Sequence, residues 1–159
     1  MAEMSDIDRL VALEEIKRLK SRRDRAVDDK DWQTLESLHA PDHVSHVDGF
    51  EPWKSAAEMI RNIRASMEGV TSVHQCHTPD ITFESPTRAT GIWAMSDYLS
   101  WKQGDEEHWL RGYGFYEEKY EKRDGRWVYV WRRLRRLKVD ISPGGVLPYM
   151  RNSAGARPS

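Results

Sequence analysis

The chain has 159 residues, with 25 lysines and arginines against 26 aspartates and glutamates, and a formal net charge of −1. This balance gives no overall indication of a nucleic-acid or membrane-surface partner, and no apolar run is long enough to cross a bilayer. One cysteine excludes an internal disulfide framework, and the Cys and His spacings do not suit structural zinc.

The first half of the chain predicts helices that start at polar caps. Ser5 or Asp6 and, later, Asp31 precede apolar-periodic segments, where a side-chain oxygen can accept from free backbone N–H groups. A short extended piece with His43 and His46 separates the last two helices. The expected helices span residues 5–27, 32–39 and 55–67.

The second half of the chain predicts an antiparallel sheet. Apolar and polar residues alternate clearly in the segment around Asp97, and 123–125 is a strong hairpin signal. Helices followed by strands are the α+β pattern, so we expect one α+β domain. The expected strands span 72–84, 88–102, 108–122 and 126–138, the domain 1–140, and an irregular Pro- and Gly-rich tail 141–159.

Asp97 lies in the middle of an apolar strand face. A bare carboxylate is costly to bury, so it needs a partner, and His74 on the neighbouring strand is the expected one. Many tryptophans and tyrosines indicate a pocket with flat aromatic walls, to which we assign Trp53, Trp93 and Tyr113. The sequence therefore predicts an enzyme pocket around a histidine and an acid.

Over roughly residues 8 to 140 the chain resembles the SnoaL-like branch of the nuclear transport factor 2-like superfamily, and within it the bile-acid 7α-dehydratases. The segments that carry the resemblance are 13–20, 27–32, 74–81, 89–97, 114–116 and 120–127. The resemblance implies a curved antiparallel sheet wrapped round three helices as a cone with an apolar pocket. It also implies cofactor-independent chemistry, as in scytalone dehydratase or ketosteroid isomerase, although the superfamily includes binding proteins.

The resemblance assigns roles to three residues. His74 falls where the dehydratases have their catalytic histidine, and imidazole exchanges a proton near neutral pH. The alternative is a core histidine bonded to a backbone carbonyl. Asp97 matches the family's pocket acid and Asp28 the acid at the end of the first helix, and either could orient His74. Asp97 could instead be structural and Asp28 solvated, with Asp24 as the fallback acid.

Two arginines are candidate substrate-binding residues. Arg23 falls on the apolar stripe of the first helix, where the dehydratases have a tyrosine; it could hold a carboxylate, phenolate or enolate, but extension to solvent is the expectation. Arg136 aligns with a pocket arginine of the family. The basic run 132–138 could clamp single-stranded nucleic acid, but the acidic segment 117–119 favours cross-strand pairing.

These observations and the resemblance predict a cofactor-independent lyase, specifically a dehydratase, acting by His/Asp proton transfer on a hydrophobic cyclic or aromatic substrate. The alternatives are a double-bond isomerase, a retro-aldol carbon–carbon lyase that releases formaldehyde, and a non-catalytic small-molecule-binding protein. We expect no metal, cofactor, nucleic acid or membrane partner. The resemblance implies a homo-oligomer, with a trimer favoured over a dimer, and the chain without a signal peptide is expected in the cytoplasm.

Overall fold

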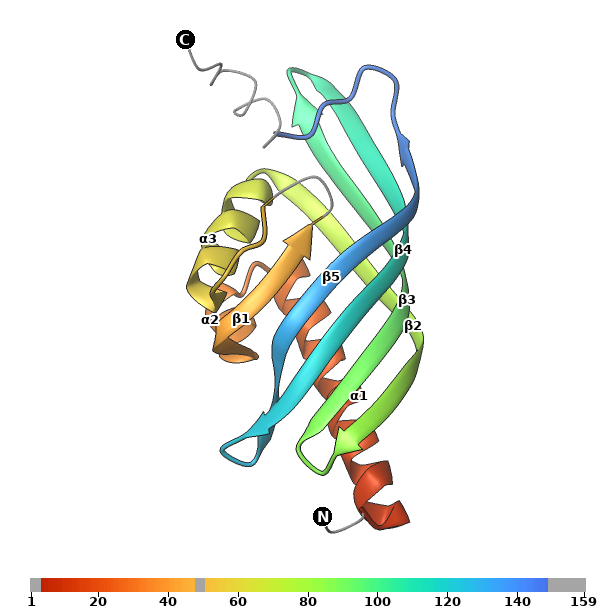
Figure 1. Ribbon diagram of the computed structural model, residues 1–159. Helices are drawn as coiled ribbons and strands as arrows, with labels where there is room; N and C mark the ends of the chain where they lie inside the picture. Colours follow the sequence, from red (N-terminus) through yellow and green to blue (C-terminus); the bar gives the residue numbers. More distant parts are fainter. Residues whose placement is uncertain (1–3, 48–50, 149–159) are drawn as a thin grey trace.

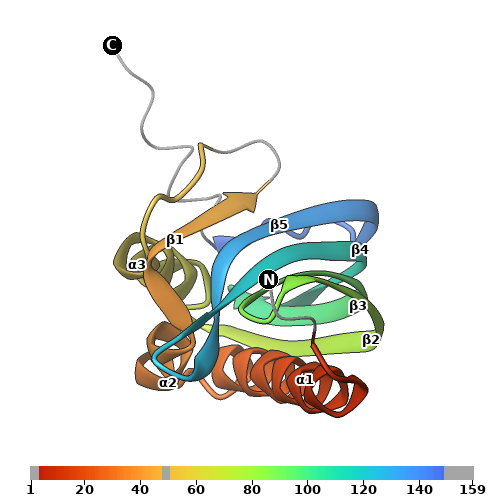
Figure 2. The ribbon, with the colours of Figure 1, turned by 60° about the horizontal axis from the view of Figure 1, so that its bottom comes forward.

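The computed structural model describes residues 4–47 and 51–148, in which a long helix lies along one side of a five-stranded sheet (Figures 1 and 2). The elements are α1 (Asp6–Asp28), α2 (Trp32–Ser37), β1 (His39–Val47), α3 (Ala56–Ser66), β2 (Val70–Ser85), β3 (Arg88–Gln103), β4 (Glu106–Arg123) and β5 (Arg126–Ile141). The strand order is β1-β5-β4-β3-β2. This is the expected α+β arrangement.

The first two helices begin at predicted caps, and the third begins after Ser55, which the prediction placed inside that helix. The side chains of Ser5, Asp31 and Ser55 accept from backbone N–H groups three residues further on, at 3.0–3.1 Å. The predicted end of the second helix is wrong by two residues, because α2 ends at Ser37 and the chain enters β1 at His39. Pairing with a strand far along the chain causes this change, and a local pattern does not show it.

The sheet is an antiparallel meander of β2 to β5 with one parallel strand added. β1 runs parallel to β5, with His39 opposite Tyr129. Asp124 and Gly125 both have positive φ (50° and 77°), as a type I′ hairpin turn requires. β2 has a bulge between Cys76 and Pro79. The hairpin is confirmed; the parallel edge strand is an addition to the predicted meander.

The helix α1 contacts both β2 and β5, which β3 and β4 separate in the sheet. One helix therefore brings side chains to both outer strands of the meander, β2 and β5. Across residues 4–47 and 51–148, no helix has the length and apolar character of a membrane span. The main core lies between α1 and the sheet and contains Ala12, Ile16, Leu19, Ala89, Trp93, Met95, Tyr116, Tyr120, Trp127 and Tyr129.

Beyond β5, the described part of the tail is held against the β3–β4 hairpin. The Oγ of Ser142 lies 2.9 Å from Nδ1 of the buried His108 and accepts from the backbone N–H of Trp109. Leu147 is buried against a small cluster around Trp101. The rest of the predicted tail, 149–159, lies outside the described residues.

Candidate active site

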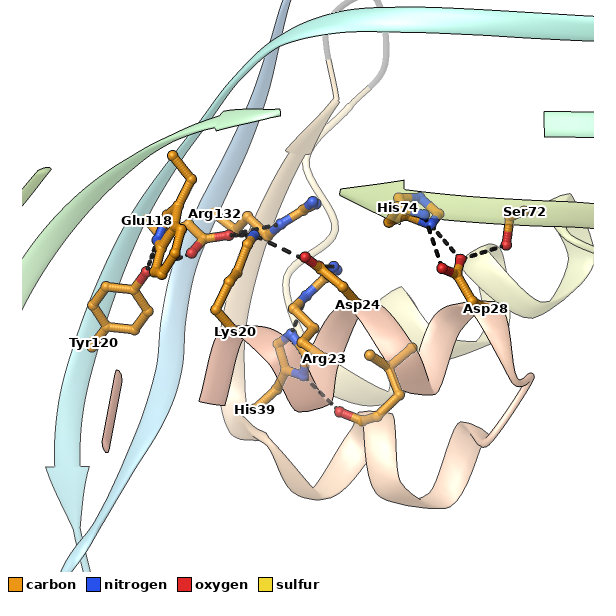
Figure 3. A network of polar contacts seen from close by, with 12 residues as sticks. Lys20, Arg23, Asp24, Asp28, His39, Ser72, His74, Glu118, Tyr120 and Arg132 are labelled. Atoms are coloured by element: carbon orange, nitrogen blue, oxygen red, sulfur yellow. Dashed lines mark hydrogen bonds and ion pairs between the residues drawn. The ribbon is translucent and has the colours of Figure 1, made fainter. Parts of the chain in front are cut away.

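A polar stripe runs along the face of α1 that points into the protein. Lys20, Asp24 and Asp28 leave the helix at intervals of four residues, which places them on one face (Figure 3). Asp28 lies off the apolar stripe of Leu19, as its position in the sequence indicates. The four-residue spacing of Lys20, Asp24 and Asp28 is the pattern in the sequence that indicates a second stripe, polar and facing inward.

His74 on β2 and Asp28 at the end of α1 form a hydrogen-bonded pair (Figure 3). Nδ1 of His74 lies 2.6 Å from Oδ1 of Asp28, and the backbone N–H of His74 donates to Oδ2 at 2.8 Å. The hydroxyl of Ser72 donates to Oδ1 at 2.8 Å. Because a carboxylate only accepts, Nδ1 carries the proton and Nε2 is the basic nitrogen. Within residues 4–47 and 51–148, Nε2 has no hydrogen-bond partner.

A cavity of about 770 Å³ lies beside this pair, a volume typical of small-molecule sites. Its wall combines the ring of Trp93 with Cys76 and Pro79. Burial raises the pKa of the Cys76 thiol to about 12, so this cysteine is not a nucleophile at neutral pH. The other lining residues are Lys17, Lys20, Ser21, Asp24, Arg25, Asp28, Asp29, His74, Gln75 and His77.

The predicted pair of His74 and Asp97 is wrong. The two residues are register partners in β2 and β3, but Arg136 binds the Asp97 carboxylate through two bonds, Nη1–Oδ1 at 2.9 Å and Nη2–Oδ2 at 2.6 Å. Arginine matches a carboxylate in both charge and fork geometry, so it is the stronger partner. The acid that orients His74 comes from α1.

The Asp97–Arg136 pair crosses β4 at a residue without a side chain. Gly112 is the register partner of Asp97, and a Cβ on it would lie 1.6 Å from Nη1 of Arg136 and 2.2 Å from Oδ1 of Asp97. The bare backbone at Gly112 is what lets the pair connect β3 with β5.

We therefore expect Gly112→Ala to lower the free energy of unfolding by about 2–4 kcal/mol, because it forces a mostly buried ion pair apart. Gly125→Ala is the control: its Cβ meets open space, and only the positive φ opposes it, at about 1 kcal/mol. Urea unfolding of both variants measures the difference. A loss in Gly112→Ala no greater than in Gly125→Ala would contradict this account.

A second buried network lies nearer the N-terminal end of α1, around Lys20 (Figure 3). Nζ of Lys20 contacts Oε1 of Glu118 at 2.6 Å, and Nε of Arg132 donates to the same oxygen at 3.2 Å. The hydroxyl of Tyr120 donates to the other oxygen of Glu118 and accepts from Nε1 of Trp93 at 2.8 Å. A chain of polar contacts thus connects the cavity wall at Trp93 with the buried carboxylate.

Arg23 is buried, with 2% of its surface exposed, so the expectation that it extends to solvent is wrong. Its Nε donates to Nε2 of His39 at 3.2 Å, and Nδ1 of His39 donates to the Leu35 carbonyl at 2.7 Å. Burial and the nearby Arg23 guanidinium hold the pKa of His39 well below its usual value and lower that of His43 to about 3. Both imidazoles are neutral at pH 7.

A family model described as a SnoaL-like domain matches residues 8–133. The chain belongs to the SnoaL-like domain family. Its fold is that of the nuclear transport factor 2-like superfamily.

Several solved structures are similar to this SnoaL-like domain. A type 2 hexachlorocyclohexane dehydrochlorinase has a TM-score of 0.79 and 20% identity, covering 89% of this chain and 95% of its own. A candidate scytalone dehydratase from Novosphingobium aromaticivorans has a TM-score of 0.77 and 18% identity, and the match covers 86% of this chain and 91% of that one. A type 3 hexachlorocyclohexane dehydrochlorinase from Novosphingobium barchaimii has a TM-score of 0.73 and 23% identity, and the match covers 89% of this chain and 97% of that one. At such identities the likeness shows the shared fold.

Two aromatic residues assigned to the pocket wall of the SnoaL-like domain lie elsewhere. Tyr113 sits between two inward-facing glycines of β4, so its own side chain points outward and is 42% exposed. Trp53 forms an isolated bridge with Ser45 of β1 and is not among the residues that line the cavity. Trp93 is part of the wall. The Tyr113 assignment is corrected by strand parity.

Sequence reasoning missed the burial of Glu118. The sequence predicts cross-strand pairs for the segment 117–119, and Glu117 contacts Arg135 at 3.0 Å on the outer face. Glu118 has the opposite parity, which it shares with Tyr116 and Tyr120, and faces α1. That alternation was the available signal. Within the two described ranges, no three His, Cys, Asp or Glu side chains converge as a metal site would require.

Proposed function

We propose that this SnoaL-like domain is a cofactor-independent lyase, and specifically a dehydratase, in which His74 is the general base. The observation that carries the proposal is the 2.6 Å contact between Nδ1 of His74 and Asp28 at the edge of a 770 Å³ cavity. A neutral imidazole with one nitrogen fixed by a carboxylate is the usual form of a base that works near pH 7.

The proposed reaction needs one proton transfer in each direction. Nε2 of His74 takes a proton from a substrate carbon next to the one that bears a hydroxyl. The carbon–carbon double bond forms as the carbon–oxygen bond breaks, and the imidazolium returns the proton to the departing oxygen, which leaves as water. Asp28 stabilises the imidazolium between these steps. Arg136, which binds Asp97, the register partner of His74, would stabilise enolate-like charge.

The cavity supports a hydrophobic cyclic or aromatic substrate. Trp93, Cys76 and Pro79 form the apolar part of the lining, whereas the base and its acid belong to the larger polar part. Two similar structures carry the names of enzymes that eliminate a small molecule, a dehydrochlorinase and a candidate dehydratase, and this favours elimination. Return of the proton to a different carbon would make the same residues an isomerase, which product analysis distinguishes.

The test is a screen of hydroxylated ring compounds for loss of one water molecule, followed by His74→Gln. We expect kcat to fall by about 10²- to 10⁴-fold, because general base catalysis contributes that much. His46→Gln is the control, since His46 lies on β1, packs against Trp131 of β5 and is not among the residues that line the cavity. Turnover that survives His74→Gln would remove His74 from the mechanism. Ring compounds that bind without any turnover would support the binding-protein alternative.

A further inference from the structure

The helix α1 ends in a turn that usually contains glycine. The backbone N–H of Asp31 donates to the carbonyl of Ala26 at 2.8 Å, and that of Lys30 donates to the carbonyl of Val27 at 3.2 Å, which are the two bonds of a Schellman motif. Lys30 has a φ of 61°, in the left-handed region. Glycine adopts this conformation freely, whereas a Cβ atom approaches the following carbonyl oxygen. The chain therefore has a lysine at a position that favours glycine.

The Lys30 side chain extends to the acid that holds the proposed base. Its Nζ lies 3.4 Å from Oγ of Ser72, a long hydrogen bond, and Ser72 is buried. The Ser72 hydroxyl donates to Oδ1 of Asp28 at 2.8 Å, and Nδ1 of His74 lies 2.6 Å from the same oxygen. Figure 3 shows the Asp28 carboxylate bonded to His74 on one side and to Ser72 on the other. Lys30, Ser72, Asp28 and His74 thus form one chain of contacts.

The chemistry of the groups fixes the direction of each hydrogen bond in this chain. An ammonium only donates and a carboxylate only accepts, so Lys30 donates to Ser72 and Ser72 donates to Asp28. Hydrogen bonds that follow one another in this way polarise one another. Partial burial lowers the pKa of Lys30, and the Asp28 carboxylate opposes this change. The charges of Lys30 and Asp28 therefore act on each other.

These two charges act on the His74 ring in opposite directions. A carboxylate beside an imidazole favours the protonated ring, whereas a nearby cation favours the neutral ring. A general base must be neutral when it meets its substrate. Asp28 alone would shift His74 towards the protonated form, and the Lys30 ammonium works against that shift.

We propose that Lys30 is a positioning residue of the candidate active site, which holds Asp28 through Ser72 and keeps His74 neutral. The left-handed backbone at Lys30 is then the conformation that brings its ammonium to Ser72, and such strain is typical of functional sites. That His74 acts as a base rests on the proposed function. The effect of Lys30 on the protonation of His74 requires no substrate.

Other charged groups face His74 from the elements around it. On β2 the other titratable side chain in the cavity lining with a charge near neutral pH is His77, and on β3 the register partner Asp97 is bound by Arg136 of β5. On α1, the charged residues that line the cavity besides Asp28 are Lys17, Lys20, Asp24, Arg25 and Asp29. All of these groups are kept in every variant at position 30, so a difference between the variants reports on Lys30.

The test follows the protonation of the His74 ring by NMR between about pH 5 and pH 8, with the signal assigned from its absence in His74→Gln. We expect the pH of half-protonation to rise by about 0.5–1 unit in Lys30→Gly, because the opposing positive charge is lost. Lys30→Asn should give the same rise, since asparagine is neutral and also tolerates the left-handed conformation. Lys30→Arg should keep the native value, because it keeps the charge.

Urea unfolding distinguishes a positioning residue from a structural one. Glycine relieves the strain of the turn, so Lys30→Gly should unfold at the same urea concentration as the native protein or a higher one. A loss of stability in Lys30→Gly without a rise in the pH of half-protonation would make Lys30 a structural part of the helix end and overturn the proposal.

Arg22→Gln is the matched control, because it removes an exposed positive charge from the same helix. It should keep the native pH of half-protonation, since exposed charges are screened by salt. An unchanged value in Lys30→Gly, or an equal rise in Arg22→Gln, would overturn the proposal. Turnover that survives His74→Gln would remove the base but leave these protonation measurements unaffected, so the two failures are distinguishable.

Discussion

Glu118→Ala is expected to lower the free energy of unfolding by about 3–5 kcal/mol, measured by urea unfolding at pH 7. The Glu118 side chain has no exposed surface, and it is the closest carboxylate to both Lys20 and Arg132. Its removal leaves Arg132 without its carboxylate partner, Lys20 with only the more distant Asp24 at 3.8 Å, and the Tyr120 hydroxyl without an acceptor. Three buried cations, Lys20, Arg23 and Arg132, already outnumber the buried carboxylates Asp24 and Glu118 in this network, so the loss adds to an existing cost.

The chain offers a matched control at the preceding residue. Glu117 contacts Arg135 at 3.0 Å in the same pair of strands, but the two side chains are 30% and 41% exposed. An exposed pair of this kind contributes less than about 1 kcal/mol, so Glu117→Ala should be nearly neutral. Similar losses in the two variants would show that burial of the carboxylate does not set the effect.

The second large effect is a dependence of stability on pH. His39 and His43 lie edge to face with ring centres 4.6 Å apart, and Arg23 and Arg132 act on both. The unfolded chain can protonate both imidazoles below about pH 6.5, whereas burial and the arginines hold the pKa of His43 at about 3 in the folded protein.

The direction in which stability changes with pH follows from the number of protons that each state binds. Between these pKa values the unfolded state binds more protons, so stability rises with pH and is lost as pH falls below about 6.5. Each histidine contributes about 1.4 kcal/mol per pH unit, and the pair up to about 2.7. Urea unfolding between pH 5 and pH 8 measures this slope. The stability added by either neutral imidazole is fully present above pH 7.

His43→Gln provides the control for the pH prediction. The variant removes one titrating group, so the slope below pH 6.5 should fall by about one proton, or about 1.4 kcal/mol per pH unit. The slope is the measured quantity because the absolute stability of the variant also changes for packing reasons. An unchanged slope would show that other groups cause the pH dependence.

The sequence by itself determined the local structure. Side-chain oxygens at Ser5, Asp31 and Ser55 start the helices, and the Asp124–Gly125 pair closes a hairpin, because each depends on neighbours within four residues. Strand alternation likewise assigns Asp97 to the inner face. These properties are set by backbone geometry over short distances.

Only the tertiary structure decided the partners. Asp28 and His74 are 46 residues apart, and they meet because α1 ends beside β2. Asp97 turns to Arg136 because Gly112 leaves room across β4. The parity of a residue fixes which face it occupies, but its partner depends on which charges from distant segments reach the same interior. Arg23 shows this most clearly: its periodicity places it on an inward stripe, and the packing of α1 between β2 and β5 made it a buried cation.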